Sequence, residues 1–348
     1  MLIQKPGRII LIILILLALQ GCSSIVYKAA YPTLNDGKYD SEFPYKGSSK
    51  ELEDVGRSVT LINSIAFYKA YIFNDGTNVK RSDISEEFLE NKSNSTSYFN
   101  KINSGTATTV YSQGGTIALL TCAHVVNFPD TILTFFSDES GKFTKYLESV
   151  SIRERQVTFV PELSSGGQVE ILALDRERDL AIIGNNFPGL NSIKRTVFPF
   201  PKGKAKDLEW GSFVYVFGYP MNYKMVSKAI VSNPNYDEKG GFIIDAVVNK
   251  GFSGGVVLAI RDGIPNFELV GIIRAIPEEN EYLLEPEKLK NNIYYSPVVP
   301  YKGNIYAVQQ EQLKYGIAKV IPIEEIMEFI NNKEYELKKL GYRIKDNF

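Results

Sequence analysis

Hydrophobic and polar residues alternate over short stretches along most of the chain, a pattern that predicts β-strands. Gly, Pro, Asn and Asp separate these stretches at short intervals, as in β-sandwiches and β-barrels. A helical period appears only near the C-terminus, where Ile326, Phe329, Ile330 and Leu337 mark one face of a helix over 323–340. The predicted strands cover 58–62, 65–68, 106–111, 116–121, 131–136, 157–160, 169–174, 180–183, 213–217, 243–248, 256–260 and 269–275. The sequence therefore predicts an all-β body with a C-terminal helix.

The N-terminus has the pattern of an export signal. Lys5 and Arg8 precede an apolar run over 9–19, which is too short to span a bilayer as a helix. The run ends in Leu19-Gln20-Gly21-Cys22, which resembles a bacterial lipobox with cleavage before Cys22 and lipid on its sulfur. An ordinary signal peptide and an uncleaved anchor are the alternatives. We expect residues 1–21 to be a lipoprotein signal peptide that places the chain in the bacterial cell envelope. In the bacterial lipoproteins that this segment resembles, a non-acidic residue after the lipidated Cys often goes with outer-membrane sorting, so with Ser23 the resemblance favours the outer membrane.

Two further segments lack strand periodicity. Residues 22–55 are rich in Tyr, Ser, Gly, Asp and Lys, and we expect them to form a tether between the lipid and the folded body. Residues 75–104 are polar and are expected to form a solvated loop. The folded body is expected over 56–335, divided at about residue 190, with the terminal helix at about 322–340.

Composition excludes some functions and limits the cysteine chemistry. The 348 residues are 44% hydrophobic with a net charge of −1, which suits a packed core and gives no support to nucleic-acid binding. If Cys22 carries lipid, Cys122 has no partner for an intramolecular disulfide. A thiol near a histidine can be a nucleophile. However, Cys122 lies two residues before His124, so we favour a buried, hydrophobic role for it.

Three short motifs combine into a catalytic pattern. His124 is the only histidine and lies in Leu-Leu-Thr-Cys-Ala-His-Val-Val; Asp179-Leu-Ala and Gly251-Phe-Ser253-Gly-Gly follow it. Gly-x-Ser-x-Gly is the nucleophile elbow of α/β-hydrolases, but that family needs a histidine after the serine. Subtilisins need the acid before the histidine. The order His124, Asp179, Ser253 is that of chymotrypsin.

The chain resembles the trypsin-like peptidase superfamily, and most closely its bacterial HtrA/Deg branch. Besides the three motifs, Val-Phe-Gly218-Tyr-Pro resembles the Gly-x-Pro stretch before the nucleophile, and Tyr-Gly316-Ile-Ala-Lys-Val-Ile-Pro322 the segment before the last helix. The resemblance covers roughly 105–335. It implies two six-stranded β-barrels, about 56–190 and 191–320, with the active site between them. Only about 26 residues follow Pro322, too few for the PDZ domain that many members carry.

The resemblance also implies the role of each site residue. Ser253 is the expected nucleophile, His124 the base and Asp179 the residue that orients the imidazole. Asp175 competes for the acid role, but the buried run after Asp179 favours the latter. The backbone N–H groups of Gly251 and Ser253 are expected to form the oxyanion hole. Val247 is a weak candidate for the floor of the specificity pocket, and with one histidine in the chain no metal or other cofactor is implied.

Departures from the family pattern leave alternatives open. Phe252 replaces the usual Asn or Asp and could block the leaving-group side, and Val256 replaces the usual Pro. The long separation of His124 from Asp179 implies an enlarged loop at about 137–168. The preferred function is a serine endopeptidase that cleaves protein or peptide substrates in the envelope. A catalytically inactive peptide-binding module and an envelope-assembly lipoprotein are the alternatives, and the oligomeric state is open.

Overall fold

The structure, a computed structural model, describes residues 32–138, 142–163, 167–187, 195–247, 249–275, 278–286, 298, 300–303, 305–313, 316–346 and 348. The expected signal peptide 1–21 and the expected lipidation site Cys22 lie outside these residues. Within the described ranges, no helix is both long and apolar enough to cross a bilayer.

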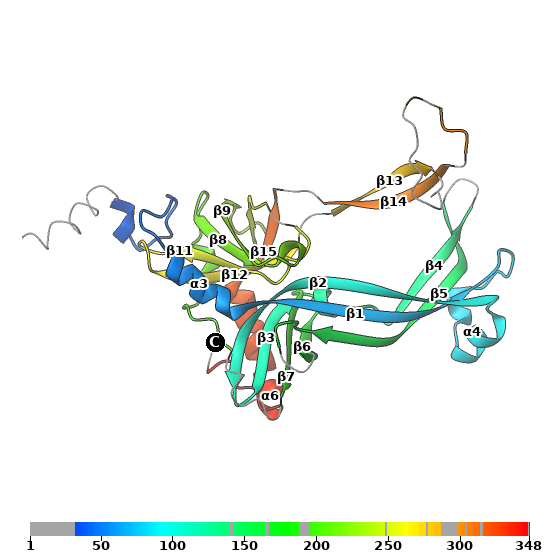
Figure 1. The fold of residues 1–348 in the computed structure, drawn as a ribbon, viewed down its shortest axis with the longest axis horizontal. Coiled ribbons are helices and arrows are strands. Elements are labelled where there is room, and N and C mark those ends of the chain that lie inside the picture. The colour runs from blue at the N-terminus through cyan, green and yellow to red at the C-terminus, as the bar shows by residue number, and fades with distance from the viewer. Residues whose placement is uncertain are drawn as a thin grey trace, which may run out of the picture.

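The first half of the chain forms a closed barrel (Figure 1). Its strands run in the order β1-β2-β3-β7-β6-β5, and β5 pairs back onto β1 to close the ring, while β4 joins the other edge of β5. The Ile, Leu and Ala side chains of β3 and β7 are buried and build much of the barrel interior. Continuous apolar runs in the sequence of these two strands account for this burial. The strands are β1 (Val59–Ile72), β2 (Ser95–Gln113), β3 (Thr116–Cys122), β4 (Thr131–Ser137), β5 (Phe143–Phe159), β6 (Gln168–Asp175) and β7 (Leu180–Asn186).

The second half forms another closed barrel, in the order β10-β15-β12-β11-β8-β9. A separate hairpin of β13 and β14 is inserted between β12 and β15. The prediction of two six-stranded barrels is confirmed. The strands are β8 (Phe213–Gly218), β9 (Met225–Asn233), β10 (Phe242–Ile244), β11 (Val256–Ile260), β12 (Phe267–Ala275), β13 (Glu278–Pro286), β14 (Ile305–Leu313) and β15 (Ala318–Pro322).

Helices are short except for the last. The predicted C-terminal helix is α6 (Ile323–Lys339), and its buried residues include the four that the sequence pattern places on one face. The helix ends at Lys339, and Gly341 follows its C-cap Leu340 with a φ of 90°, a conformation that suits a residue without a side chain. The other helical segments are α3 (Ser49–Ser58), α4 (Glu86–Lys92), α5 (Ala123–Val126), and the 3₁₀ turns η1 (Pro32–Asn35), η2 (Arg81–Asp83), η3 (Ala205–Asp207) and η4 (Pro220–Asn222).

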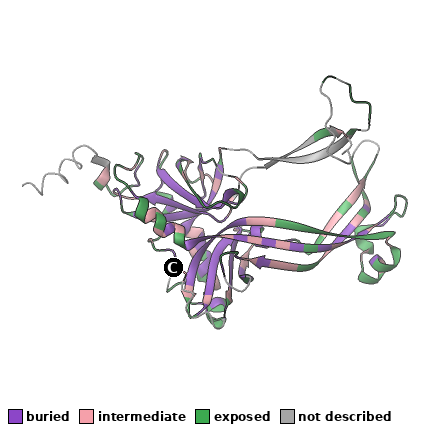
Figure 2. Cartoon of the chain, viewed as in Figure 1, coloured by how far each residue is buried: buried purple, intermediate pink, exposed green. Residues whose placement is uncertain are grey.

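Two expected loops need correction. The segment 75–104 contains η2 and α4 and ends in the first part of β2, from Ser95 onward, and most of the segment 137–168 is strand β5. β1, β2 and β5 continue beyond the barrel and, with β4, form a long sheet that we call the arm: 65–72, 95–104, 131–137 and 143–157 (Figure 1). α4 lies at its far end. Figure 2 shows that burial decreases from the barrels toward the arm. The arm parts of β1 and β4 include the predicted strands 65–68 and 131–136, whereas the first eight residues of β2 are all exposed and lack the alternation on which strand prediction depends.

The expected tether over 22–55 also differs from the structure where it is described. Tyr39 is buried against the second barrel, where its hydroxyl donates to Glu268 Oε2 (2.6 Å) and Arg261 lies 4.0 Å from its ring centroid. The backbone of Asp40 pairs with Ile260 and Phe213. The segment from Tyr39 onward is therefore part of the folded body.

Candidate active site

His124 and Asp179 meet at the junction of α5 with the turn between β6 and β7. His124 Nδ1 lies 2.8 Å from Asp179 Oδ2, and the backbone N–H of His124 donates to Asp179 Oδ1 (2.9 Å). A third bond runs from Ala123 N–H to the Asp179 carbonyl (3.0 Å). Asp179 adopts a φ of 59°, which is uncommon for a residue with a side chain and which these bonds hold in place.

These contacts fix the tautomer of the imidazole. An ionised carboxylate can only accept hydrogen bonds, so the short contact requires the hydrogen on Nδ1. Nε2 is then free to accept a proton. The carboxylate is mostly buried, with 12% of its side chain exposed, whereas 45% of the His124 side chain is exposed toward solvent. The pair therefore presents a basic nitrogen at the surface of a cleft.

Asp175, the competing candidate for the acid, points elsewhere. Its carboxylate accepts from Arg178 N–H (2.9 Å) and from the Arg178 guanidinium (3.0 Å), and these contacts lower the pKa of Asp175. The structure thus brings Asp179, rather than Asp175, to the histidine.

Ser253 lies across the same cleft, on the loop between β10 and β11. A cleft of about 560 Å³ is lined by both barrels: Ile102, Asn103, Ser104, His124, Val125, Met221, Asn222, Lys250, Gly251 and Ser253. Within the described contacts, no hydrogen bond joins Ser253 Oγ to His124. Such bonds are often long in an enzyme without substrate.

The two candidate oxyanion donors are free to act. In the described part of the chain, neither Gly251 N–H nor Ser253 N–H donates to a protein acceptor, while Phe252 N–H between them donates to Asn249 O (3.1 Å). Gly251 has a φ of 105°, and a Cβ there would lie 2.2 Å from Tyr219 O. This position therefore requires glycine, both for its conformation and for its space.

Thr106 of β2 anchors the Ser253 loop, and the sequence analysis missed it. Its N–H donates to Ser253 O (2.8 Å), and its hydroxyl donates to Gly251 O (2.6 Å) and accepts from Tyr219 N–H (2.9 Å). Thr106 is fully buried. One residue of the first barrel thus holds the carbonyl groups of Gly251 and Ser253 in the second. No local motif marks it, because its partners are 113 to 147 residues away.

Residues 105–272 match the family model of the trypsin-like peptidase domain. The matched segment contains His124, Asp179 and Ser253. Among solved structures, the chain is similar to the serine endoprotease from Yersinia pestis, at 15% identity over 84% of this chain and 67% of that chain, with a TM-score of 0.39. It is also similar to Deg5, at 16% identity over 65% of this chain and 87% of that chain, with a TM-score of 0.35. No curated protein matches the sequence.

Two further residues lie elsewhere than the sequence suggested. Phe252, which could have blocked the leaving-group side, is 1% exposed and packs its ring against the backbone of Gly218. It can do so because residue 218 has no side chain. Val247, the candidate floor of a specificity pocket, is 71% exposed and does not line the cleft, so this geometry does not support that role.

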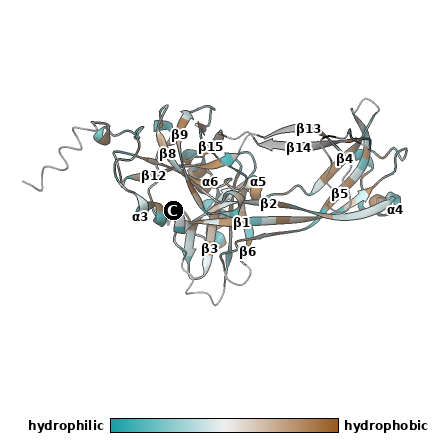
Figure 3. Ribbon diagram, turned by 45° about the horizontal axis from the view of Figure 1, so that its top comes forward, coloured by the Kyte–Doolittle hydropathy of each residue, from teal (hydrophilic) through white to brown (hydrophobic). Residues whose placement is uncertain are grey.

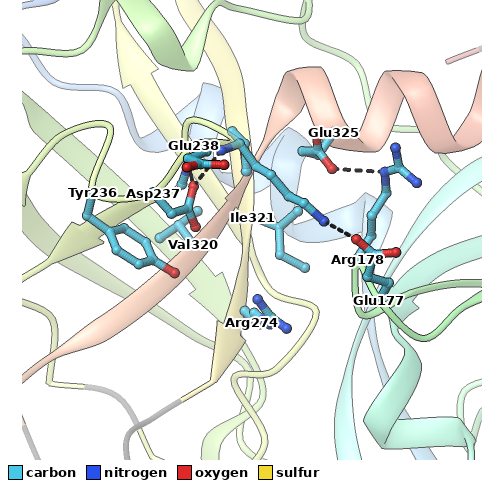
Figure 4. Close-up of a pocket in the computed structure, with 12 residues that line it drawn as sticks. Glu177, Arg178, Tyr236, Asp237, Glu238, Arg274, Val320, Ile321 and Glu325 are labelled. Atoms are coloured by element: carbon cyan, nitrogen blue, oxygen red, sulfur yellow. Dashed lines mark hydrogen bonds and ion pairs between the residues drawn. The ribbon is translucent and has the colours of Figure 1, made fainter.

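A second cavity lies near Asp179. It has a volume of about 360 Å³ and lies beside α6, near β12 and β15 (Figure 4). Several of its charged side chains pair with one another: Arg178 with Glu325 (2.8 Å) and Lys239 with Glu177 (2.7 Å). Arg274 also lines it, and its Nε lies 3.7 Å from Asp179 Oδ2. Because two of its cations are already neutralised, this cavity is a poorer candidate for a binding site than the cleft.

Cys122 lies close to the pair but does not have the chemistry of a nucleophile or a ligand. Candidate ligand atoms of Cys122, His124 and Asp179 lie within 4.8 Å of one another. However, the Cys122 thiol is buried and donates to Ile273 O (3.2 Å). Burial raises the pKa of Cys122 well above its usual range. Metal binding and nucleophilic attack both need the thiolate, so the residues do not fit a metal site.

Proposed function

We propose that this protein is a serine endopeptidase that cleaves protein substrates in the bacterial cell envelope, with Ser253, His124 and Asp179 as its catalytic triad. The observation that carries the proposal is the His124–Asp179 contact at 2.8 Å together with Ser253 on the same cleft. The match of residues 105–272 to the trypsin-like peptidase domain supports the same reaction class.

In the proposed reaction, Ser253 Oγ attacks the carbonyl carbon of the scissile peptide bond while its proton passes to His124 Nε2. Asp179 stabilises the imidazolium that forms. The C–N bond then breaks, and the proton on Nε2 passes to the leaving amine. Water next attacks the acyl-enzyme ester through the same base, which releases the acid and restores Ser253. No step requires a metal.

The oxygen of the tetrahedral intermediate would lie against the free N–H groups of Gly251 and Ser253. Each such donor contributes roughly 3 kcal/mol to transition-state stabilisation in comparable sites. Thr106 is a positioning residue in this proposal, because it holds the carbonyl groups of Gly251 and Ser253 rather than touching substrate.

The proposed envelope location depends on Cys22. Lipid on this sulfur would attach the folded body to a membrane, with the outer membrane favoured. Incorporation of radiolabelled palmitate into the chain in a bacterial host tests this point, and Cys22→Ser is expected to abolish it. Incorporation that persists in Cys22→Ser would refute the proposed anchor without bearing on the protease.

The decisive test of catalysis is labelling with a fluorophosphonate, which reacts only with an activated serine. We expect labelling of the full chain and at least a hundredfold slower labelling of Ser253→Ala and His124→Ala. Ser112→Ala provides a matched control, since Ser112 lies outside the cleft. Absence of labelling in a demonstrably folded protein would refute the proposal and favour the inactive peptide-binding alternative.

A further inference from the structure

One edge of strand β2 is open and leads directly out of the cleft. β2 pairs with β1 along Ser95–Thr108 without a register shift, whereas β3 pairs with β2 only over Thr108–Gln113. Among the described residues, no strand therefore covers the second edge of β2 before Thr108. Ile102, Asn103 and Ser104 belong both to this edge and to the cleft lining.

The backbone geometry shows which groups this edge presents. In an antiparallel pair, each residue points its N–H and C=O either toward the partner or away from it, in alternation. Thr106 points away from β1, because its N–H donates to Ser253 O. Since the register with β1 is uninterrupted, Ser104, Ile102, Asn100 and Tyr98 also point their N–H and C=O groups away from β1. These are the groups that an added strand would bind.

Apolar side chains gather along the same stretch of the arm. Tyr98 is 67% exposed, Ile102 59% and Phe67 38%, and the register places all three on one face of the sheet. A groove of about 410 Å³ is lined by Phe67, Tyr68, Tyr98, Phe99, Asn100, Glu154 and Arg155. Arg155 lies 5.8 Å from the Phe67 ring centroid. Figure 3 shows β1 and β2 running from the barrels to the arm. Exposed aromatic clusters of this kind mark binding surfaces.

We propose that the open edge of β2 and the groove at Tyr98 form an exosite for the part of an extended substrate that follows the scissile bond. This inference rests on the proposed function. The leaving amine must lie at His124 Nε2 to receive its proton, and β2 flanks His124, with Asn103 Nδ2 donating to His124 O (2.9 Å). β2 runs toward the cleft, so a substrate segment that leaves the cleft pairs with it in antiparallel orientation.

The strand geometry sets the length and chemistry of this segment. Tyr98 lies six residues before Ser104, and an antiparallel strand rises about 3.4 Å per residue, so the groove is about 20 Å from the cleft. A substrate needs about six to eight residues after the scissile bond to reach it. The groove selects an aromatic or aliphatic side chain at that distance.

The test uses a proteome-derived peptide library digested by the full chain in detergent, followed by resynthesis of one cleaved peptide with different lengths after the scissile bond. We expect kcat/KM to rise about tenfold when the peptide is extended from two to about ten residues after the scissile bond. The longer peptide gains backbone hydrogen bonds with β2 and apolar contacts in the groove, and about 1.4 kcal/mol of such contacts corresponds to a factor of ten. In Tyr98→Ser the ratio of long to short peptide is expected to fall to about one. Tyr335→Ser, an equally exposed tyrosine on α6, is the matched control and keeps the ratio.

The proposed backbone hydrogen bonds between the substrate and β2 can be tested separately from the groove. N-methyl groups placed one at a time after the scissile bond should weaken long-peptide cleavage at alternate positions only. Equal kcat/KM for all lengths, or a long-to-short ratio unchanged in Tyr98→Ser, would overturn the exosite while leaving the protease intact.

A second readout separates this inference from catalysis. Ser253→Ala immobilised on a support is expected to retain library peptides with apolar residues, and Ser253→Ala/Tyr98→Ser to lose them. If fluorophosphonate labelling fails but this capture succeeds, the proposed protease is refuted and the edge remains a peptide site. If sedimentation instead shows a dimer that Tyr98→Ser dissociates, the occupant is a second copy of the chain and the proposal is wrong.

Discussion

Thr106→Val tests how strongly the first barrel holds the Ser253 loop of the second. Valine has nearly the same shape as threonine but lacks the hydroxyl that donates to Gly251 O and accepts from Tyr219 N–H. The change leaves two buried backbone groups without these partners, and each such loss costs about 1–3 kcal/mol. We therefore expect the free energy of unfolding to fall by about 2–6 kcal/mol, which is a large part of the total for a typical domain.

Urea unfolding followed by fluorescence measures this loss, and fluorophosphonate labelling measures its effect on the site. The rate of labelling should fall by more than the unfolded fraction accounts for, because Gly251 and Ser253 lose a fixed position. Thr109→Val is the control in the same strand: its hydroxyl is buried with no hydrogen-bond partner among the described atoms. Its removal should be neutral or stabilise by about 1 kcal/mol. Equal losses in the two variants would refute the anchoring role of Thr106.

Three further predictions concern the buried Asp40 carboxyl, the close approach of Gly251 to Tyr219, and the buried Cys122 thiol. Burial raises the pKa of Asp40 to about 6, so its favourable contribution to stability is complete below about pH 4 and is lost as the pH rises through 6. Asp40→Asn should raise the free energy of unfolding by about 2 kcal/mol at pH 7 and leave it unchanged near pH 4, as urea titrations at both pH values would show. Gly251→Ala should abolish fluorophosphonate labelling, because its Cβ would lie 2.2 Å from Tyr219 O; normal labelling would mean that the loop adapts. Cys122 should resist iodoacetamide at pH 8 in the native protein and react only in denaturant, as mass spectrometry of the alkylated chain would reveal.

The sequence was most informative where strands lie in a barrel core. β3 and β7 are buried on both faces over most of their length, and their continuous apolar runs were predicted as strands. His124 follows β3 closely and Asp179 directly precedes β7. α6 was predicted to within a residue, since a buried helix face leaves a clear 3.6-residue period. The choice of Asp179 over Asp175 also rested on this reasoning, because only Asp179 directly precedes a fully buried strand.

The part of the arm that β2 forms could not be predicted in the same way. Residues 95–102 of β2 are exposed on both faces, so no alternation distinguishes them from a polar loop. Their strand conformation comes from pairing with β1, which is an interaction between segments about 30 residues apart. Thr106 was missed for a related reason: its hydroxyl is informative only once the two barrels are placed against each other.

Phe252 shows how a departure from a family motif can be absorbed by another position. Judged from its neighbour Ser253 alone, a phenylalanine could block the leaving-group side, but its side chain is buried. The ring instead occupies the space over Gly218, where a Cβ would lie 2.4 Å from the Phe252 ring. The two residues are therefore coupled, since any side chain at position 218 would clash with the Phe252 ring where it now lies. A residue next to a candidate nucleophile has to be judged with the residue on which it packs. In this chain that residue is Gly218 at the end of β8, in the Gly-x-Pro stretch that precedes Ser253 in sequence.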